Sequence, residues 1–114
     1  MSTSSTGWVT EYYAAWDRAD ADQIMQWFTD DIVLEDVPTG HIATGVAQAR
    51  AFVEHAIAMT PGTTYEIVHS AVTDDAFATE WIMRPAGLRG SSVGTIRDGR
   101  ITSNRDYWNA ASVR

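Results

Sequence analysis

The chain of 114 residues has the length of one domain, and its 45% hydrophobic and 20% charged residues are typical of a globular fold. Its net charge of −7, from 15 acidic and 8 basic residues, argues against nucleic acid as a partner because phosphate is repelled. Cysteine is absent, which excludes disulfides, thiolate metal sites and a cysteine nucleophile. No apolar run approaches the roughly 20 residues of a membrane span, and residues 1–7 lack the features of a signal peptide. We therefore expect a single cytoplasmic domain over residues 1–114, with a flexible tail at residues 1–6.

Two helices are predicted in the first part of the chain. An apolar stripe at helical spacing predicts the first over residues 6–18, and it consists of Trp8, Val9, Tyr12, Tyr13 and Trp16. Asp20 then matches an N-cap, and Gln23 three residues later completes a capping box. The second helix is short and ends at the pair Asp30-Asp31. Its apolar residues are Ile24, Met25, Trp27 and Phe28.

A short strand and a third helix follow. Residues 32–36 are apolar and β-branched with a carboxylate at the end, and a period of two places Leu34 and Asp36 on one face. A loop containing proline and glycine separates this strand from a helix that begins after Thr44 and ends at residues 60–63. The apolar stripe of this helix is Val46, Ala49, Phe52, Val53, Ala56 and Ile57.

The second half of the chain is a run of strands separated by turns. The predicted strands are 64–72, 76–84, 88–97 and 100–109. Asp98-Gly99 between two strand-like runs is the strongest hairpin signal in the chain. The resulting order is ααβαββββ, and long antiparallel strands after helices indicate the α+β class. A twisted sheet of this kind can curl round a helix and leave a cavity at its open end.

Three groups of segments carry a resemblance to a known superfamily. They are residues 12–16 with 19–22 and 27–31, then residues 34–36 with Pro38 and Thr44-Gly45, then residues 98–101 with 104–108. In this order they resemble the NTF2-like superfamily, specifically its SnoaL-like and ketosteroid-isomerase-like branch. The resemblance implies a cone of three N-terminal helices packed on a strongly curved, mostly antiparallel sheet. Isomerases, polyketide cyclases, epoxide hydrolases, dehydratases and non-catalytic binders share this fold, so the site residues must decide the function.

Asp36 and Tyr12 are the first catalytic candidates. If Asp36 lies on the core face of its strand, burial raises the pKa of its carboxyl and suits proton abstraction; otherwise it is a solvated strand end or a cap for the following loop. The resemblance to ketosteroid isomerases places Asp36 at the general base and Tyr12 at the donor to the forming oxyanion, with Tyr13 as the alternative tyrosine. The second oxyanion donor of those isomerases, a neutral carboxylic acid, corresponds to Ser91 or Ser92. This departure puts full ketosteroid isomerase activity in doubt.

Asp106 is the other candidate acid or base. A period of two places it on one face of the last strand with Asn104 and Trp108. The resemblance puts Asp106 at the aspartate of the family's terminal signature, which is an acid or base in SnoaL-like cyclases and epoxide hydrolases. Asn104 is then its neighbour, suited to a hydrogen bond with a ligand oxygen. The structural alternative is an ion pair between Asp106 and Arg84 or Arg105.

Large apolar residues are candidates for the wall of a ligand pocket. The resemblance to epoxide hydrolases calls for a bridging arginine and an aspartate on the third strand, but those places hold Trp81 and Met83. Alternating large groups on a concave face form a pocket wall, and the further candidates for it are Leu34, Trp27, Phe52 and Trp108. His41 lies in a loop near the expected cavity mouth. The three histidines are scattered, so we expect neither a metal site nor a cofactor.

Three hypotheses for the function remain open. The first is a cofactor-independent enzyme in which Asp36 or Asp106 moves a proton next to the carbonyl of a small hydrophobic compound, as in an isomerase or a polyketide cyclase. The second is epoxide hydrolysis by the pair of aspartates, and the third is non-catalytic binding of a small molecule. The resemblance also implies a homodimer, because relatives commonly pair through the outer face of the sheet.

Overall fold

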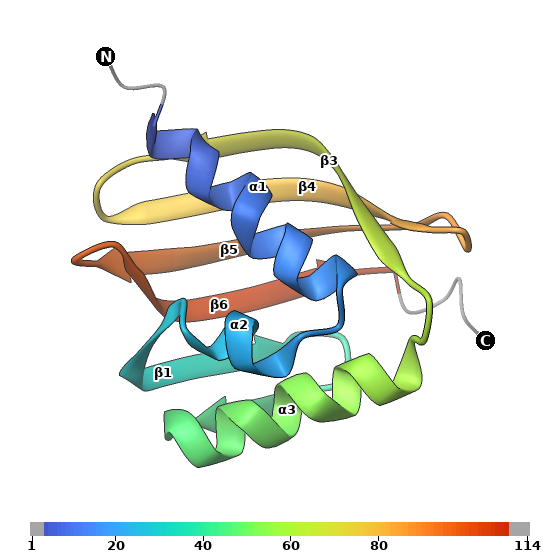
Figure 1. Ribbon diagram of the computed structural model, residues 1–114, viewed down its shortest axis with the longest axis horizontal. Helices are drawn as coiled ribbons and strands as arrows, with labels where there is room; N and C mark the ends of the chain where they lie inside the picture. The colour runs from blue at the N-terminus through green and yellow to red at the C-terminus, as the bar shows by residue number, and fades with distance from the viewer. Residues whose placement is uncertain (1–3, 110–114) are drawn as a thin grey trace.

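The computed structural model describes residues 4–109 and the side chains of residues 7–109. Three helices pack on one six-stranded sheet (Figure 1): α1 (Ser4–Asp17), α2 (Ala21–Met25), α3 (Gly45–Met59), β1 (Phe28–Asp36), β2 (His41–Thr44), β3 (Thr64–Val72), β4 (Ala76–Arg84), β5 (Leu88–Arg97) and β6 (Arg100–Trp108). This arrangement confirms the predicted α+β class and the curved, mostly antiparallel cone. Of the tail expected at residues 1–6, residues 1–3 lie outside the described part, and α1 begins at Ser4.

The strand order brings the first and last strands of the chain together. The sheet runs β2-β1-β6-β5-β4-β3, and β1 pairs with β6 in parallel while every other neighbouring pair is antiparallel. Helix α1 packs on β3, and α3 packs on β1 and β2 along the same side of the sheet (Figure 1). Because β1 and β6 run in the same direction, Asp36 and Asp106 become register partners near the ends of their strands.

The second helix is shorter than its apolar spacing predicts. It ends at Met25, and the expected helical residues Trp27 and Phe28 belong to the approach and the start of β1. The Ile101 backbone N–H donates to the Trp27 carbonyl at 2.7 Å, so pairing with β6 overrides the local helical pattern. The N-cap prediction is confirmed, since Asp20 Oδ1 accepts from the Gln23 backbone N–H at 3.1 Å.

The loop predicted before the third helix contains the short strand β2. Its four residues pair antiparallel with β1 and end at Thr44, which caps α3 without a side-chain hydrogen bond. Gln48 Oε1 instead accepts from the Thr44 backbone N–H at 2.9 Å. On α3, Ala49 and Val53 are buried as predicted, whereas Val46, in the first turn of the helix, is exposed.

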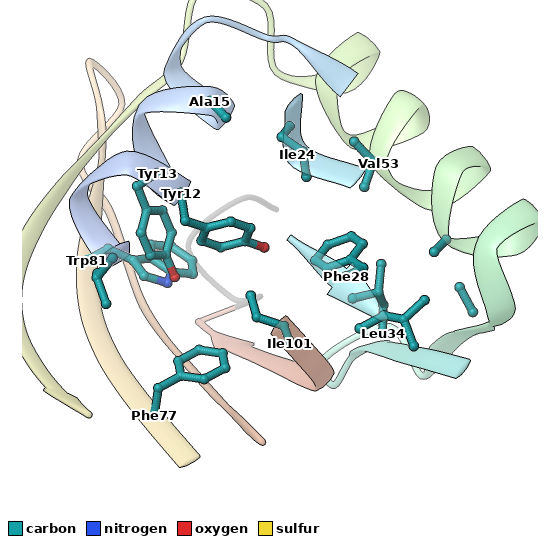
Figure 2. Packing of buried hydrophobic residues seen from close by; sticks show 14 residues of the cluster. Tyr12, Tyr13, Ala15, Ile24, Phe28, Leu34, Val53, Phe77, Trp81 and Ile101 are labelled. Atoms are coloured by element: carbon teal, nitrogen blue, oxygen red, sulfur yellow. The ribbon is translucent and has the colours of Figure 1, made fainter. Parts of the chain in front are cut away.

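Aromatic rings fill much of the space between the helices and the sheet (Figure 2). Two glycines of β5 make room for them. A Cβ on Gly90 would lie 2.5 Å from the Trp81 ring, and one on Gly94 would collide with the Phe77 ring. The rings therefore lie directly over the backbone of β5. Among the described helices, none is long and apolar enough to cross a membrane.

Candidate functional site

A row of polar residues crosses the helix-facing side of the sheet. Thr79, Ser92, Asp106 and Asp36 are successive register partners on β4, β5, β6 and β1, and His41 extends the row onto β2. Thr79 and Ser92 are buried. The row therefore places two carboxylates beside each other in a largely apolar layer.

Neutral donors hold the carboxylate of Asp106. Ser92 Oγ and Asn104 Nδ2 both donate to Asp106 Oδ1, at 2.6 and 2.8 Å. The serine is oriented in turn by Trp81 Nε1, which donates to Ser92 Oγ at 2.9 Å. Asp106 takes part in none of the ion pairs within the described residues, and Arg84 pairs with Glu66 instead. Among the side chains that the structure describes, the carboxylate is thus held by neutral donors and not by an ion pair.

This environment changes the protonation of Asp106. Burial raises the pKa of its carboxyl above the ordinary value, and the negative charge of Asp36 adds to the rise. The hydrogen bonds from Ser92 and Asn104 act in the opposite direction, because they favour the charged form. A carboxyl whose pKa is shifted toward neutral pH is suited to both accept and return a proton.

Asp36 is held by a different pair of donors. Trp108 Nε1 donates to Asp36 Oδ1 at 2.6 Å, and Thr39 Oγ1 donates to Asp36 Oδ2 at 2.7 Å. Asp36 and Trp108 are both half-buried. Each oxygen of Asp36 therefore has a partner within the protein, whereas the two bonds to Asp106 converge on one of its oxygens.

The negative charge of Asp106 contributes to the raised pKa of three nearby tyrosines. Tyr12 is buried among aromatic rings, with its own ring directed into the core beside Phe28 (Figure 2). Burial raises its pKa, with smaller contributions from Tyr13 and Asp106. Burial likewise raises the pKa of Tyr13 and Tyr65, and in both the charge of Asp106 adds to the rise. Tyr13 is the one that joins the polar row, since its hydroxyl lies 2.9 Å from Thr79 Oγ1.

The predicted wall residues lie in the same layer. Leu34 and Trp81 are buried, while Trp27, Phe52, Met83 and Trp108 are partly buried and pack against the core. His41 is exposed and stacks on the ring of Phe52, with 5.3 Å between ring centroids.

Two surface hollows lie away from the carboxylates. The larger one, about 520 Å³, is an open depression lined by α1, α2 and the turn before β6, including Trp27 and Arg100. Asp36, Asp106 and Tyr12 line neither hollow. Within residues 7–109, no group of three acidic or histidine side chains is placed to hold a metal ion.

The family model of the SnoaL-like domain matches residues 9–104, which is most of the chain. The chain belongs to the SnoaL-like family. No functionally curated protein matches it. The match ends at residue 104, so Asp106 of this SnoaL-like domain lies two residues beyond the matched segment.

The fold of this SnoaL-like domain is similar to the folds of several solved structures. A SnoaL-like protein of unknown function from Burkholderia thailandensis is 18% identical, with 93% of this chain and 95% of the other covered and a TM-score of 0.82. A candidate polyketide cyclase from Sinorhizobium meliloti is 25% identical, with 86% and 91% covered and a TM-score of 0.74. SalBIII, an epoxide hydrolase/cyclase-like enzyme of pyran ring formation in the polyether salinomycin, is 21% identical, with 91% and 89% covered and a TM-score of 0.77.

Several contacts of the site were not expected from the sequence. Trp81 and Trp108 were predicted as apolar wall residues, but their indole nitrogens donate to Ser92 and to Asp36. Ser92 was considered as a donor to a ligand, yet its hydroxyl bonds to Asp106. The only signal available in the sequence was the period of two, which puts each of these residues on the inner face.

Proposed function

We propose that this SnoaL-like domain is a cofactor-independent enzyme in which Asp106 moves a proton on a small hydrophobic carbonyl compound. The observation that carries the proposal is the half-buried carboxylate of Asp106, whose pKa is raised by burial and which accepts hydrogen bonds from the neutral donors Ser92 and Asn104. A carboxylate without a bound cation keeps its basicity, whereas an ion pair would lower it.

The proposed reaction begins with removal of a proton from the carbon next to the carbonyl. The Asp106 carboxylate takes the proton, the C–H electrons form a carbon–carbon double bond, and the carbonyl oxygen becomes an enolate oxygen. Tyr12 is proposed as the hydrogen-bond donor to that oxygen, in the position that the family resemblance assigns to it. Protonated Asp106 then returns the proton to a different carbon in an isomerisation. In a cyclisation the enolate carbon attacks a second carbonyl, and Asp106 protonates the new alkoxide.

Asp36 is proposed to support this step from the adjacent strand. It is the register partner of Asp106, and its negative charge contributes to the raised pKa of the Asp106 carboxyl. Because both oxygens of Asp36 already accept hydrogen bonds from Trp108 and Thr39, it is the less available of the two as a base.

Exchange of carbon-bound protons in heavy water tests the proposal without knowledge of the natural substrate. A panel of small cyclic ketones and 1,3-diketones is incubated with the protein, and loss of the α-proton signal is followed by NMR. We expect the wild-type chain to accelerate exchange for at least one compound, and Asp106→Asn to reduce the rate by about 100-fold or more. Asp31→Asn is the matched control, because Asp31 is an exposed carboxylate on the same strand as Asp36. Exchange that is equally fast in Asp106→Asn would refute the assignment.

Opening of an epoxide is the second candidate function. It is favoured by the adjacency of Asp36 and Asp106 on parallel strands and by the likeness of the fold to SalBIII. One carboxylate would take a proton from a water or hydroxyl nucleophile while the other, protonated, gives its proton to the epoxide oxygen. Formation of a diol from cyclohexene oxide, lost in both Asp36→Asn and Asp106→Asn, would support this reaction. A small molecule that binds without any of these reactions would indicate a non-catalytic binding domain.

The homodimer implied by the family resemblance remains a prediction. Tyr107 is 42% exposed on the strand face opposite to Asp106, where a partner would meet the sheet. Light scattering of the full chain is expected to give twice the mass of 12.6 kDa, and a monomer at all concentrations would contradict it.

A further inference from the structure

Among residues 7–109, one buried polar atom near Asp106 has no hydrogen-bond partner. Asn104 is 6% exposed, and it lies on β6 between its register partners Gly94 on β5 and Leu34 on β1. Its Nδ2 donates to Asp106 Oδ1, but its Oδ1 is buried and accepts no hydrogen bond. An acceptor buried without a donor destabilises the folded state, and native proteins contain few of them.

The orientation of the Asn104 amide is fixed by its neighbour. Exchanging the two ends of the amide would place two acceptor oxygens, Asn104 Oδ1 and Asp106 Oδ1, about 2.8 Å apart, which the ionised carboxylate opposes. The unpartnered oxygen is therefore a property of the site whenever Asp106 carries its charge.

Three donors near Asp106 bond to other protein groups. Ser92 donates to Asp106, Trp81 donates to Ser92 and Trp108 donates to Asp36. The Tyr12 hydroxyl is the donor proposed for the substrate oxygen, so the acceptors Asn104 Oδ1 and the carboxylate of Asp106 remain for a donor of the ligand. A complementary ligand must bring a donor, because a ligand with acceptors alone leaves Asn104 Oδ1 unpaired.

We infer that Asn104 Oδ1 accepts a hydrogen bond from an O–H or N–H group of the substrate, so that the substrate is a hydroxyl- or amine-bearing compound and not a plain ketone. This inference rests on the proposed function in one respect, which is that the substrate binds against Asp106. The donor group would lie next to the carbon or oxygen that gives its proton to Asp106, and Asn104 would select for it.

Binding of matched aromatic probes to the full chain tests the inference. Phenol carries an O–H donor, anisole replaces it with a methyl ether, and benzylamine carries a charged N–H donor. Dissociation constants are measured by NMR titration of the tryptophan indole N–H signals. One added hydrogen bond to a neutral acceptor predicts that phenol binds about 5- to 10-fold more tightly than anisole. Benzylamine binding more tightly than phenol would identify an amine as the donor, and the reverse order would identify a hydroxyl. Equal affinities for all three would overturn the inference.

The variant Asn104→Leu separates ligand recognition from a purely structural role. Leucine has a similar size but neither accepts nor donates, so the preference for phenol over anisole should disappear. Ser103→Ala on the same strand is the control, and it should keep the preference. If Asn104 only positions Asp106, Asn104→Leu would lower the free energy of unfolding while the probe preference persists, which would also overturn the inference. Should Asn104→Leu fail to fold, Asn104→Ala, which also removes both the acceptor and the donor but has less bulk, replaces it.

These outcomes are distinct from a failure of the proposed function. A chain that prefers phenol but catalyses no exchange of α-protons keeps this inference and loses the enzymatic proposal. A chain that catalyses exchange but binds phenol and anisole equally keeps the enzymatic proposal and loses the role of Asn104.

Discussion

The Ser92 hydroxyl donates to Asp106 Oδ1 at 2.6 Å from the directly opposite position on β5. The family resemblance placed a second donor to the substrate oxyanion at Ser91 or Ser92. In this chain the Ser92 hydroxyl instead donates to Asp106, and the hydrogen bond from the Trp81 indole orients that hydroxyl. In the proposed function Ser92 therefore positions Asp106, and the proposed donor to the oxyanion is a tyrosine.

Replacing Ser92 by alanine should alter both the charge and the stability of the site. Loss of the hydrogen bond that lowers the pKa of Asp106 should raise that pKa further. The Trp81 indole N–H would lose its acceptor, so we expect a loss of about 1–3 kcal/mol in the free energy of unfolding. Urea denaturation measures the stability, and the pH profile of α-proton exchange measures the pKa. Ser91→Ala on the other face of β5 serves as the control, and an equal loss in both variants would contradict this assignment.

The stability of the chain should depend on pH through Asp106. Its folded-state pKa is raised above 3.8, so its protonation favours the folded state, and this contribution is lost as the pH rises through the folded pKa. Asp106→Asn carries no such titration. The free energy of unfolding of Asp106→Asn minus that of the wild type should therefore increase as the pH rises from 4 to 8. Denaturation curves at intervals of one pH unit measure the difference, and a difference that stays constant or decreases would be inconsistent with a raised pKa.

The hydrogen bond between Trp108 and Asp36 should contribute measurably to the closure of β1 against β6. Trp108→Phe keeps most of the ring but removes the N–H donor, and a hydrogen bond to a charged group contributes about 1.5–3 kcal/mol. Thermal and urea unfolding should show a loss in this range. Tyr107→Phe, at the exposed neighbouring position, is the comparison and should change stability by less than about 0.5 kcal/mol. If Trp108→Phe and Tyr107→Phe had the same stability, the hydrogen bond from Trp108 to Asp36 would contribute nothing to the free energy of unfolding.

Gly94 should not tolerate a side chain. An alanine Cβ there would collide with the Ser103 carbonyl and the Phe77 ring, and a backbone atom cannot move aside as a flexible side chain does. We expect Gly94→Ala to destabilise by about 1–3 kcal/mol or more. Gly7→Ala, in α1 with no atom within 4 Å of the new methyl, should instead be neutral or stabilising, because alanine favours the helix. Similar stabilities of the two variants would refute the close contact.

The sequence predicted the elements that depend on local patterns. The four long strands and the first and third helices appear close to their expected bounds, because period-two and period-3.6 patterns report directly on burial. Trp27 and Phe28 were assigned to a helix, and β2 was missed, since both segments owe their conformation to pairing with distant strands. Such pairing has no local signature in one sequence.

The sequence predicted which face of their strands the candidate residues occupy, but not the contacts that they make. Asp36, Asn104 and Asp106 do lie together on the inner face, because alternation along a strand fixes which face a residue occupies. The indole donors to Ser92 and Asp36 depend on how rings cross neighbouring strands, which alternation does not specify. The exposed place of Val46 and the stacking of His41 on Phe52 also depend on the tertiary packing of α3.

The proposed role of Asp106 as a base requires that its partly buried surroundings raise the pKa of its carboxyl. A carbon-13 NMR titration of the Asp106 carboxyl in the full chain, with Asp106→Asn to assign the signal, tests it without any substrate. We expect a titration midpoint clearly above 3.8, moving upward in Ser92→Ala. A midpoint at or below 3.8 would show that the carboxylate is stabilised in its charged form, and the proposed role of Asp106 as the base would be wrong.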